Sequence, residues 1–183
     1  MRGPTNVERQ AGVFTARQYE IYKCCNYVRE NYSLVNIYGQ AGIGKTRFVK
    51  EIAYYMNCRY RFFSGIYYLD LGQVKSTDEF KELLQKENLT FRNSDTLLIL
   101  DDVYNMFKHN HSQFRWWIID IITRYQVTIL ITSRNSVLEH LEDDHLMMKD
   151  IELSPLNMIE SVELLLSTCK KQITLDDMGI YSD

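Results

Sequence analysis

The chain has 183 residues, enough for one domain with a sizeable core, and it carries 21 basic and 24 acidic side chains. The net charge of −3 and the lack of a basic block argue against a dominant role on nucleic acid or on a membrane surface. The N-terminus is polar and no apolar run approaches transmembrane length, so neither a signal peptide nor a membrane span is indicated and we expect a cytoplasmic protein.

The N-terminal part of the chain predicts a polar segment followed by a helix. Residues 1–13 are polar, and we expect them to be flexible. Thr15 and Gln18 fit a T-x-x-Q capping box. The helix is predicted to run to about Asn31, because apolar residues recur at helical spacing: Ile21, Cys24, Cys25 and Val28. The four cysteines of the chain form no C-x-x-C pair, so we expect reduced thiols and no zinc or redox site.

A glycine-rich stretch follows an apolar run at 34–38 and precedes a helix with one apolar face. It fits G-x-x-x-x-G-K-[ST], the phosphate-binding loop or P-loop, in the strand–loop–helix context that the motif requires. Glycines let the backbone approach a ligand closely, and successive N–H groups at a helix N-terminus bind anions. We therefore assign to nucleotide binding the loop and the residue after it: Gly39, Gln40, Ala41, Gly42, Ile43, Gly44, Lys45, Thr46 and Arg47.

Two side chains of the P-loop have specific expected roles. Lys45 adds a full positive charge for the β- and γ-phosphates, which also makes it a catalytic candidate. The hydroxyl of Thr46 is placed to ligate Mg²⁺. The ligands that we expect are therefore ATP or ADP together with Mg²⁺.

The rest of the chain alternates between predicted strands and helices. Apolar runs predict strands at 65–71, 96–102, 128–132 and 150–153. Helical spacing and capping residues predict helices that begin at Thr77 or Asp78, that cover 114–125 and 137–141, and that run from Asn157 to about Cys169. This order predicts an α/β three-layer sandwich with a mainly parallel five-stranded sheet. The corresponding fold is a P-loop NTPase of the ASCE type with strand order 5-1-4-3-2, in which ligands lie beyond the carboxyl ends of the strands.

Two adjacent carboxylates close the third predicted strand. Asp101 can hold a water-coordinated Mg²⁺, because Mg²⁺ is a hard ion that keeps several of its waters. Asp102 can orient or deprotonate the attacking water and is the second catalytic candidate. Two acids before a turn would carry little information alone, but about fifty residues after a P-loop they favour a magnesium site.

An arginine follows the fourth predicted strand, in the run Thr132-Ser133-Arg134. Its guanidinium can donate two hydrogen bonds to a γ-phosphate and so report its presence, which makes Arg134 a nucleotide-binding candidate. His109 and His111 alternate in a polar stretch without further ligands, so we expect a solvated loop there and no metal site.

The chain resembles the nucleotide-binding domain of NB-ARC-type STAND ATPases. The resemblance rests on the P-loop, on runs 97–103 and 129–134, and on segment 14–20, which is similar to the F-x-G-R-x-x-E segment of that family with Ala16 in place of Gly. It implies that Phe14 and Arg17 border the adenine site. Leu153-Ser154-Pro155-Leu156 resembles the entry to the family's next helical subdomain, and Pro155 is implied as a further nucleotide contact.

The same resemblance implies a domain division and a function. We expect a flexible segment 1–13, a P-loop NTPase domain 14–155, and the start of a truncated helical subdomain with a loose tail at 156–183, without the family's later helical lid and winged-helix domain. The implied function is a nucleotide-dependent switch in signalling or assembly, with a protein partner or self-association and slow hydrolysis at most.

Two other functions stay open on the residues alone. One is an AAA+-like ATPase that works in a ring on DNA or protein. Such rings usually donate an arginine from the helix between the fourth and fifth strands to the site of the next subunit, but residues 135–150 contain no arginine. The other is a small-molecule kinase, which would need an acceptor pocket and an arginine-rich lid that the sequence does not show.

Overall fold

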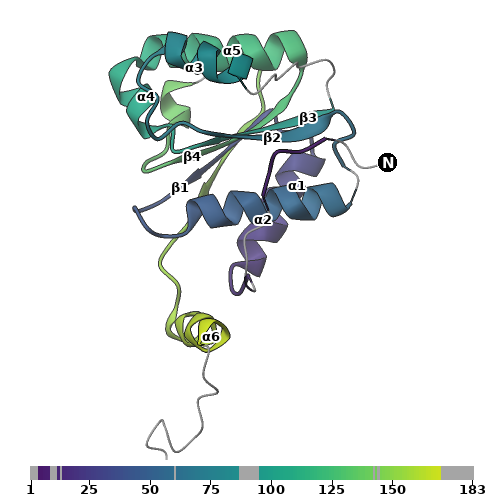
Figure 1. Ribbon diagram of the computed structural model, residues 1–183, viewed down its shortest axis with the longest axis vertical. Coiled ribbons are helices and arrows are strands. Elements are labelled where there is room, and N and C mark those ends of the chain that lie inside the picture. Colours follow the sequence, from purple (N-terminus) through teal and green to yellow (C-terminus); the bar gives the residue numbers. More distant parts are fainter. Residues whose placement is uncertain are drawn as a thin grey trace, which may run out of the picture.

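The structure is a computed structural model that describes residues 4–8, 12, 14–59, 61–86, 95–141, 143 and 145–169. Five strands form one sheet in the order β2-β3-β4-β1-β5, and every pairing between them is parallel. Their bounds are β1 Leu34–Tyr38, β2 Gly65–Asp70, β3 Thr96–Asp101, β4 Thr128–Ser133 and β5 Met148–Glu152. The predicted three-layer fold and its strand order are confirmed (Figure 1).

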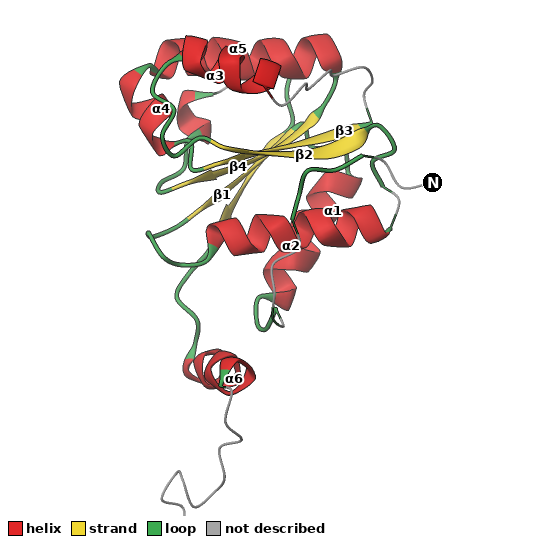
Figure 2. Cartoon of the chain, in the orientation of Figure 1, coloured by secondary structure: helices red, strands yellow, loops and turns green. Residues whose placement is uncertain are grey.

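Helices cover both faces of the sheet, as Figure 2 shows. One face carries α1 (Gln18–Arg29) and α2 (Lys45–Cys58), and the opposite face carries α3 (Thr77–Lys86), α4 (Tyr104–His109) and α5 (His111–Tyr125). Each face has its own apolar cluster, with Phe48 and Ile52 at the centre of one and Phe80 and Phe114 in the other. A strand covered on both faces reads as a continuous apolar run, which is why all six residues of β3 are buried.

Two further elements lie on either side of β5. A 3₁₀ turn, η1 (Leu138–His140), lies before β5, and α6 (Met158–Thr168) follows it. Helix α6 begins with the predicted capping box, in which Asn157 and Glu160 each accept from the other's backbone N–H. In Figure 1, α6 stands apart from the three layers, beyond the end of the sheet. No helix in the described ranges is long and apolar enough to cross a membrane.

The predicted capping box at Thr15 and Gln18 is wrong. The N-cap of α1 is Arg17, which makes no side-chain cap and has a φ of 60°. Ala16 also has a positive φ, of 67°, so the chain makes a left-handed turn immediately before the helix and carries Thr15 away from the free N–H groups. Ala16 therefore occupies a conformation that glycine adopts more readily.

Part of the N-terminal segment expected to be flexible contacts the sheet. The carbonyl of Pro4 accepts a hydrogen bond from the backbone N–H of Ile66, at 3.0 Å. The Asn6 side chain accepts from the N–H of Tyr68 at 2.7 Å and donates to its carbonyl at 3.0 Å. Strand β2 is an edge strand, and these contacts satisfy backbone groups that sheet pairing leaves open. Residues 1–3, 9–11 and 13 lie outside the described residues.

Candidate functional site

The P-loop joins the carboxyl end of β1 to the first turn of α2. At Gly39 a Cβ atom would come within 2.6 Å of the Leu153 carbonyl oxygen, so only glycine allows the chain beyond β5 to lie this close. Gly44 is the N-cap of α2 and has a φ of 98°, a conformation that L side chains rarely adopt. The loop can therefore present its N–H groups at a helix N-terminus, the arrangement that binds phosphate.

Lys45 lies against its own loop. Its Nζ donates to the carbonyls of Gly39 and Gln40, at 2.7 and 2.9 Å. Burial lowers the pKa of Lys45, while the negative charges of Asp102 and Asp101 oppose this effect. A cavity of about 390 Å³ opens here, lined by Ala41, Gly42, Gly44, Lys45, Thr46, Arg47, Asp101, Asp102, Thr132 and Arg134. The structure thus brings the P-loop and the two strand-end motifs of the sequence into one cavity, called here the phosphate cavity.

Asp101 is almost fully buried, with 3% of its surface exposed, and three hydroxyl groups donate to its carboxylate. Thr46 Oγ1 and the Tyr68 hydroxyl each lie 2.7 Å from Oδ2, and Thr132 Oγ1 donates to Oδ1. A buried carboxylate needs such donors, because an unpaired charge away from water is costly. Burial raises the pKa of the Tyr68 hydroxyl, and its hydrogen bond to Asp101 and the negative charge of Asp101 add to this effect.

The donor set of the phosphate cavity fits Mg²⁺. Thr46 and Asp101 offer only hard oxygen atoms, which Mg²⁺ prefers. Among the described residues no group of three or more His, Cys, Asp or Glu could hold a metal by itself. Proteins usually bind Mg²⁺ through one or two carboxylates and the phosphates of a nucleotide.

Asp102 differs from its neighbour in conformation and surroundings. Its φ is 53°, in the left-handed region, and its backbone N–H donates to Thr132 Oγ1 at 2.8 Å. Its carboxylate is half-buried, lines the phosphate cavity and lies close to Gly72, after β2. This is the exposure that a residue acting on a water molecule requires.

Arg134 lies at the rim of the phosphate cavity. Its side chain is exposed, and its guanidinium carbon is 4.5 Å from the ring centroid of Tyr104, at the start of α4. An arginine stacked on an aromatic face keeps its N–H groups available for an anion.

A second cavity, of about 300 Å³, adjoins the first. It is lined by Gly12, Phe14, Thr15, Arg17, Ile43, Gly44, Arg47, Leu156, Leu164 and Thr168. We call it the base cavity. Gly44 and Arg47 line both cavities, so the two are neighbours at the start of α2. Phe14 and Arg17, implied as neighbours of the adenine, lie in the base cavity, whereas Pro155 is exposed and its neighbour Leu156 lines the wall.

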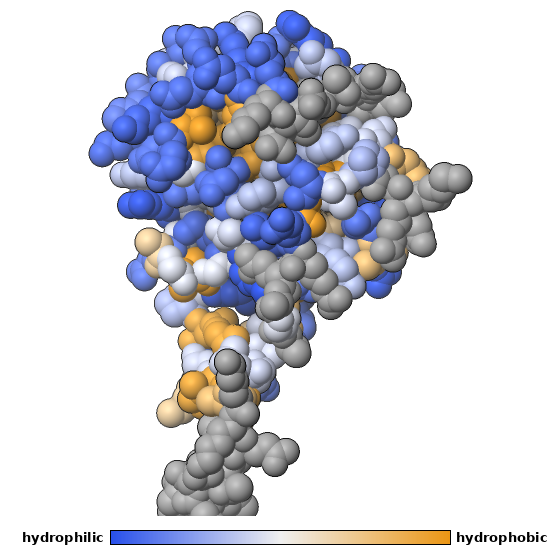
Figure 3. All heavy atoms as spheres, in the orientation of Figure 1, coloured by the Kyte–Doolittle hydropathy of each residue, from blue (hydrophilic) through white to orange (hydrophobic). Residues whose placement is uncertain are grey.

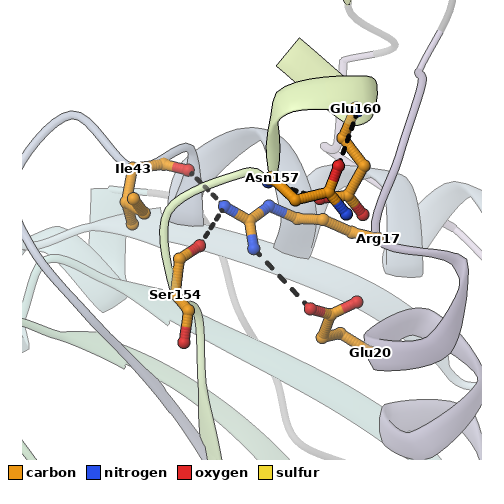
Figure 4. Close-up of polar contacts among 6 residues, drawn as sticks. All are labelled: Arg17, Glu20, Ile43, Ser154, Asn157 and Glu160. Atoms are coloured by element: carbon orange, nitrogen blue, oxygen red, sulfur yellow. Dashed lines mark hydrogen bonds and ion pairs between the residues drawn. The ribbon is translucent and has the colours of Figure 1, made fainter. Parts of the chain in front are cut away.

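Arg17 is a buried link between three segments (Figure 4). Its Nη2 donates to the carbonyls of Ile43 in the P-loop, at 3.2 Å, and of Ser154 after β5, at 2.9 Å. Its Nη1 lies 3.8 Å from Glu20 Oε1. Figure 4 also draws Asn157 and Glu160, the capping residues of α6. These contacts are with the protein itself, so Arg17 shapes the base cavity through the segments that it joins.

Two polar residues of the site were not predicted in these roles. Tyr68 belongs to β2, which ends at Asp70, and its hydroxyl reaches the carboxylate at the end of the neighbouring strand. Thr132 was noted only as the residue before Ser133 and Arg134, yet it contacts both aspartates. The available signal was a polar side chain near the end of an apolar strand, which does not reveal its partner without the strand register.

Helix α6 exposes most of its apolar side chains. Figure 3 shows apolar side chains gathered over this helix, apart from the hydrophilic surface of the α3–α5 layer. The exposed set on the helix is Met158, Ile159, Val162, Leu164, Leu165 and Leu166.

Comparisons with known proteins agree with this geometry. The NACHT domain family matches residues 33–172. No curated protein matches the chain. A STAND protein (signal transduction ATPase with numerous domains) with a tetratricopeptide repeat sensor, from Pyrococcus horikoshii, is 17% identical with a TM-score of 0.59 over 94% of this chain and 28% of its own. AMPPCP-bound DnaA from Aquifex aeolicus is 16% identical with a TM-score of 0.56 over 91% of this chain and 56% of its own.

A third solved structure, described as a DNA replication initiation factor, is 15% identical with a TM-score of 0.51, over 92% of this chain and 54% of its own. At these identities the likeness shows the fold alone, and the chain spans between 28% and 56% of the length of these proteins. The resemblance predicted from the sequence was to the NB-ARC type; the matching family is NACHT, so the prediction is confirmed at the level of the STAND class. The chain belongs to the NACHT domain family of STAND-class P-loop NTPases.

Proposed function

We propose that this chain is a nucleotide-dependent switch domain that binds ATP and ADP with Mg²⁺ and hydrolyses ATP slowly at most. The observation that carries the proposal is the pair of neighbouring cavities at the carboxyl edge of the sheet. One is polar, with Lys45 and two carboxylates; the other is lined by apolar residues such as Phe14 and Leu164. A nucleotide has the same division, with charged phosphates at one end and a flat base at the other.

In this proposal different side chains contact the phosphates, the metal, the attacking water and the base. The P-loop N–H groups and Lys45 bind the β- and γ-phosphates, and Thr46 and Asp101 would hold Mg²⁺, which neutralises phosphate charge when bound. Asp102 orients or deprotonates the attacking water, and Arg134 contacts the γ-phosphate. Phe14 and the residues joined by Arg17 surround the base.

The switch is proposed to act through α6. Leu164 and Thr168 of this helix line the base cavity, and Arg17 bonds the linker before the helix to the P-loop. A nucleotide that fills the base cavity therefore contacts α6 directly and favours one position of the helix. Because α6 carries an exposed apolar surface, its position decides what this surface offers to a protein partner or to a second copy.

Equilibrium binding of fluorescent ATP and ADP analogues to the full chain tests the proposal. Lys45→Ala should weaken binding strongly, because it deletes the positive charge at the phosphates and leaves the backbone of the loop intact. Lys81→Ala is the matched control, since Lys81 is an exposed lysine on α3, with 61% of its side chain accessible. Equal binding by the parent chain and Lys45→Ala would contradict the assignment of the P-loop as the phosphate-binding element.

Size-exclusion chromatography with and without AMPPCP separates the switch from the ring-forming ATPase. A ring should assemble with the ATP analogue, whereas a switch domain need not. A closed oligomer that appears only with AMPPCP would favour the ring.

A further inference from the structure

The carboxylate of Asp101 is contacted from three directions. Thr46 comes from α2, Thr132 from the neighbouring strand β4, and Tyr68 from β2 on the other side. Two of these residues, Thr46 and Thr132, also line the phosphate cavity. Tyr68 is not among the residues that line that cavity, and its hydroxyl reaches Asp101 Oδ2 from β2.

The position of Tyr68 follows from the strand register. In the β2–β3 ladder Tyr68 lies opposite Ile99, and Asp70 lies opposite Asp101. The ring therefore starts two residues before the end of the sheet, and only a side chain as long as tyrosine carries a hydroxyl up to the carboxylate. The ring packs against the apolar cluster beneath α2, and Lys50 Nζ lies 4.4 Å from its centroid. This packing limits where the ring can lie and keeps the hydroxyl beside Asp101.

A carboxylate that receives Mg²⁺ must present a defined oxygen, because Mg²⁺ demands near-ideal octahedral geometry. The Thr46 hydroxyl is itself an expected ligand, and Thr132 also accepts from the backbone of Asp102. Tyr68 has no other assigned task at the site, and its hydroxyl shares Oδ2 with Thr46. Loss of a group that orients a metal ligand in this way typically lowers metal affinity by about 10- to 100-fold.

We infer that Tyr68 is a positioning residue, whose hydroxyl holds the Asp101 carboxylate in the orientation that receives the Mg²⁺ of a bound nucleotide. This inference rests on the proposed function, since it concerns the metal at the same site. It adds a requirement that comes from β2, a strand to which no nucleotide-binding role was assigned. Tyr68 acts through Asp101 and touches neither nucleotide nor metal.

The test measures how strongly Mg²⁺ improves nucleotide binding. The dissociation constant of ADP and of AMPPCP is determined for the full chain in EDTA and again in excess Mg²⁺, and the ratio of the two values is the metal effect. Tyr68→Phe keeps the ring and its packing and removes only the hydroxyl. We expect binding in EDTA to be unchanged and the metal effect to fall by roughly tenfold or more, the usual result of losing an outer-sphere partner.

Tyr67→Phe is the matched control on the adjacent residue of the same strand. The Tyr67 hydroxyl donates to the Ser64 carbonyl at 3.3 Å, and its ring packs against the apolar cluster on the opposite face of the sheet. This variant also loses one phenolic hydroxyl from β2, so it reports any general effect of that loss on the fold. We expect its metal effect and its melting temperature to match those of the parent chain.

Each other result overturns the inference in a recognisable way. An unchanged metal effect in Tyr68→Phe would show that Tyr68 does not position Asp101 for the metal. Equal weakening in EDTA and in Mg²⁺, with a lower melting temperature, makes Tyr68 a structural residue only. If the parent chain binds nucleotide equally well with and without Mg²⁺, the magnesium role is contradicted while nucleotide binding stands. A parent chain that binds no nucleotide under either condition overturns the proposed function itself.

Discussion

Asp101 and Asp102 are neighbours in the chain but have different surroundings. Asp101 is buried and accepts three hydroxyl hydrogen bonds, whereas Asp102 is half-buried, has a left-handed backbone and lines the phosphate cavity. A carboxylate held by fixed donors suits a metal, and a more accessible one suits a water molecule. The sequence predicted the pair, but the difference between the two residues comes from the donors that the fold places around Asp101.

The two aspartates should therefore separate by role. Asp101→Asn should reduce the gain in nucleotide affinity on adding Mg²⁺, because the variant loses a charged metal ligand. Asp102→Asn should spare binding and lower the single-turnover hydrolysis rate by roughly 10²-fold or more, as expected for loss of a general base. Asp120→Asn, on the outer layer, is the control. Hydrolysis by Asp102→Asn at the parent rate would contradict the assignment.

Arg134 should discriminate ATP from ADP. A guanidinium at the cavity rim gains a charge-assisted hydrogen bond only when the γ-phosphate is present, and such a bond is worth about 1.5–3 kcal/mol. Arg134→Ala should then change the ratio of ATP to ADP affinity by roughly 10- to 100-fold. Arg124→Ala, an exposed arginine on α5, is the control. If calorimetry gives the same ratio for the parent and Arg134→Ala, Arg134 is an ordinary surface residue.

Cys25 should react slowly with alkylating reagents near neutral pH. Burial raises its pKa from 9.0 to about 11, although the charge of Arg59 opposes the shift. At pH 8 about a thousandth of this thiol is ionised, against about a tenth for an ordinary one, and the thiolate is the reactive form. Because the folded chain holds this proton more tightly than the unfolded chain, the free energy of unfolding should fall as the pH rises above 9.

Peptide mass spectrometry after brief iodoacetamide treatment measures this reactivity. Cys169 is exposed at the end of α6 and serves as the internal reference. Modification of Cys25 at pH 8 as fast as that of Cys169 would show that α1 does not protect it.

At the scale of elements, the close contact between the P-loop and the chain after β5 explains why Gly39 is required. A Cβ at Gly39 would meet the Leu153 carbonyl at 2.6 Å, whereas at Gly42, also at positive φ, it would meet nothing within 4 Å. Gly42→Ala should cost about 1–2 kcal/mol for its left-handed backbone alone. Gly39→Ala should cost about 1–3 kcal/mol more, because the backbone must shift. Thermal unfolding without nucleotide measures both, and equal losses would contradict the close approach.

The elements themselves were largely predictable, and the contacts between them were not. Apolar runs predicted the five strands, because strands buried on both faces have little freedom in composition. The alternation of these runs with helical segments predicted that the strands are parallel. Helix α4 was missed, because six residues cannot show a helical period. The loop predicted at His109 and His111 is therefore wrong, since His109 ends α4 and His111 begins α5. The contacts of Tyr68 with Asp101 and of Arg17 with Ser154 join residues 33 and 137 positions apart, so they depend on strand order and register.

At the scale of the molecule, α6 is the element that belongs least to the sandwich. Every residue of α6 except Glu160 is exposed, yet Leu164 and Thr168 complete the wall of the base cavity. The helix therefore adds little to the stability of the domain and much to the shape of the nucleotide site. The proposed division of the chain after residue 155 follows from this contrast.

A chain that ends at residue 155 should separate the two contributions. Because α6 buries so little surface, the shortened chain should keep the melting temperature of the full chain within a few degrees. It should bind ADP more weakly, since the base cavity loses Leu156, Leu164 and Thr168. Pyrophosphate, which occupies only the phosphate cavity, should bind both chains equally and should depend on Lys45 in both. If shortening lowers the affinity for pyrophosphate as much as that for ADP, or unfolds the domain, α6 is part of the sandwich and the boundary at residue 155 is wrong.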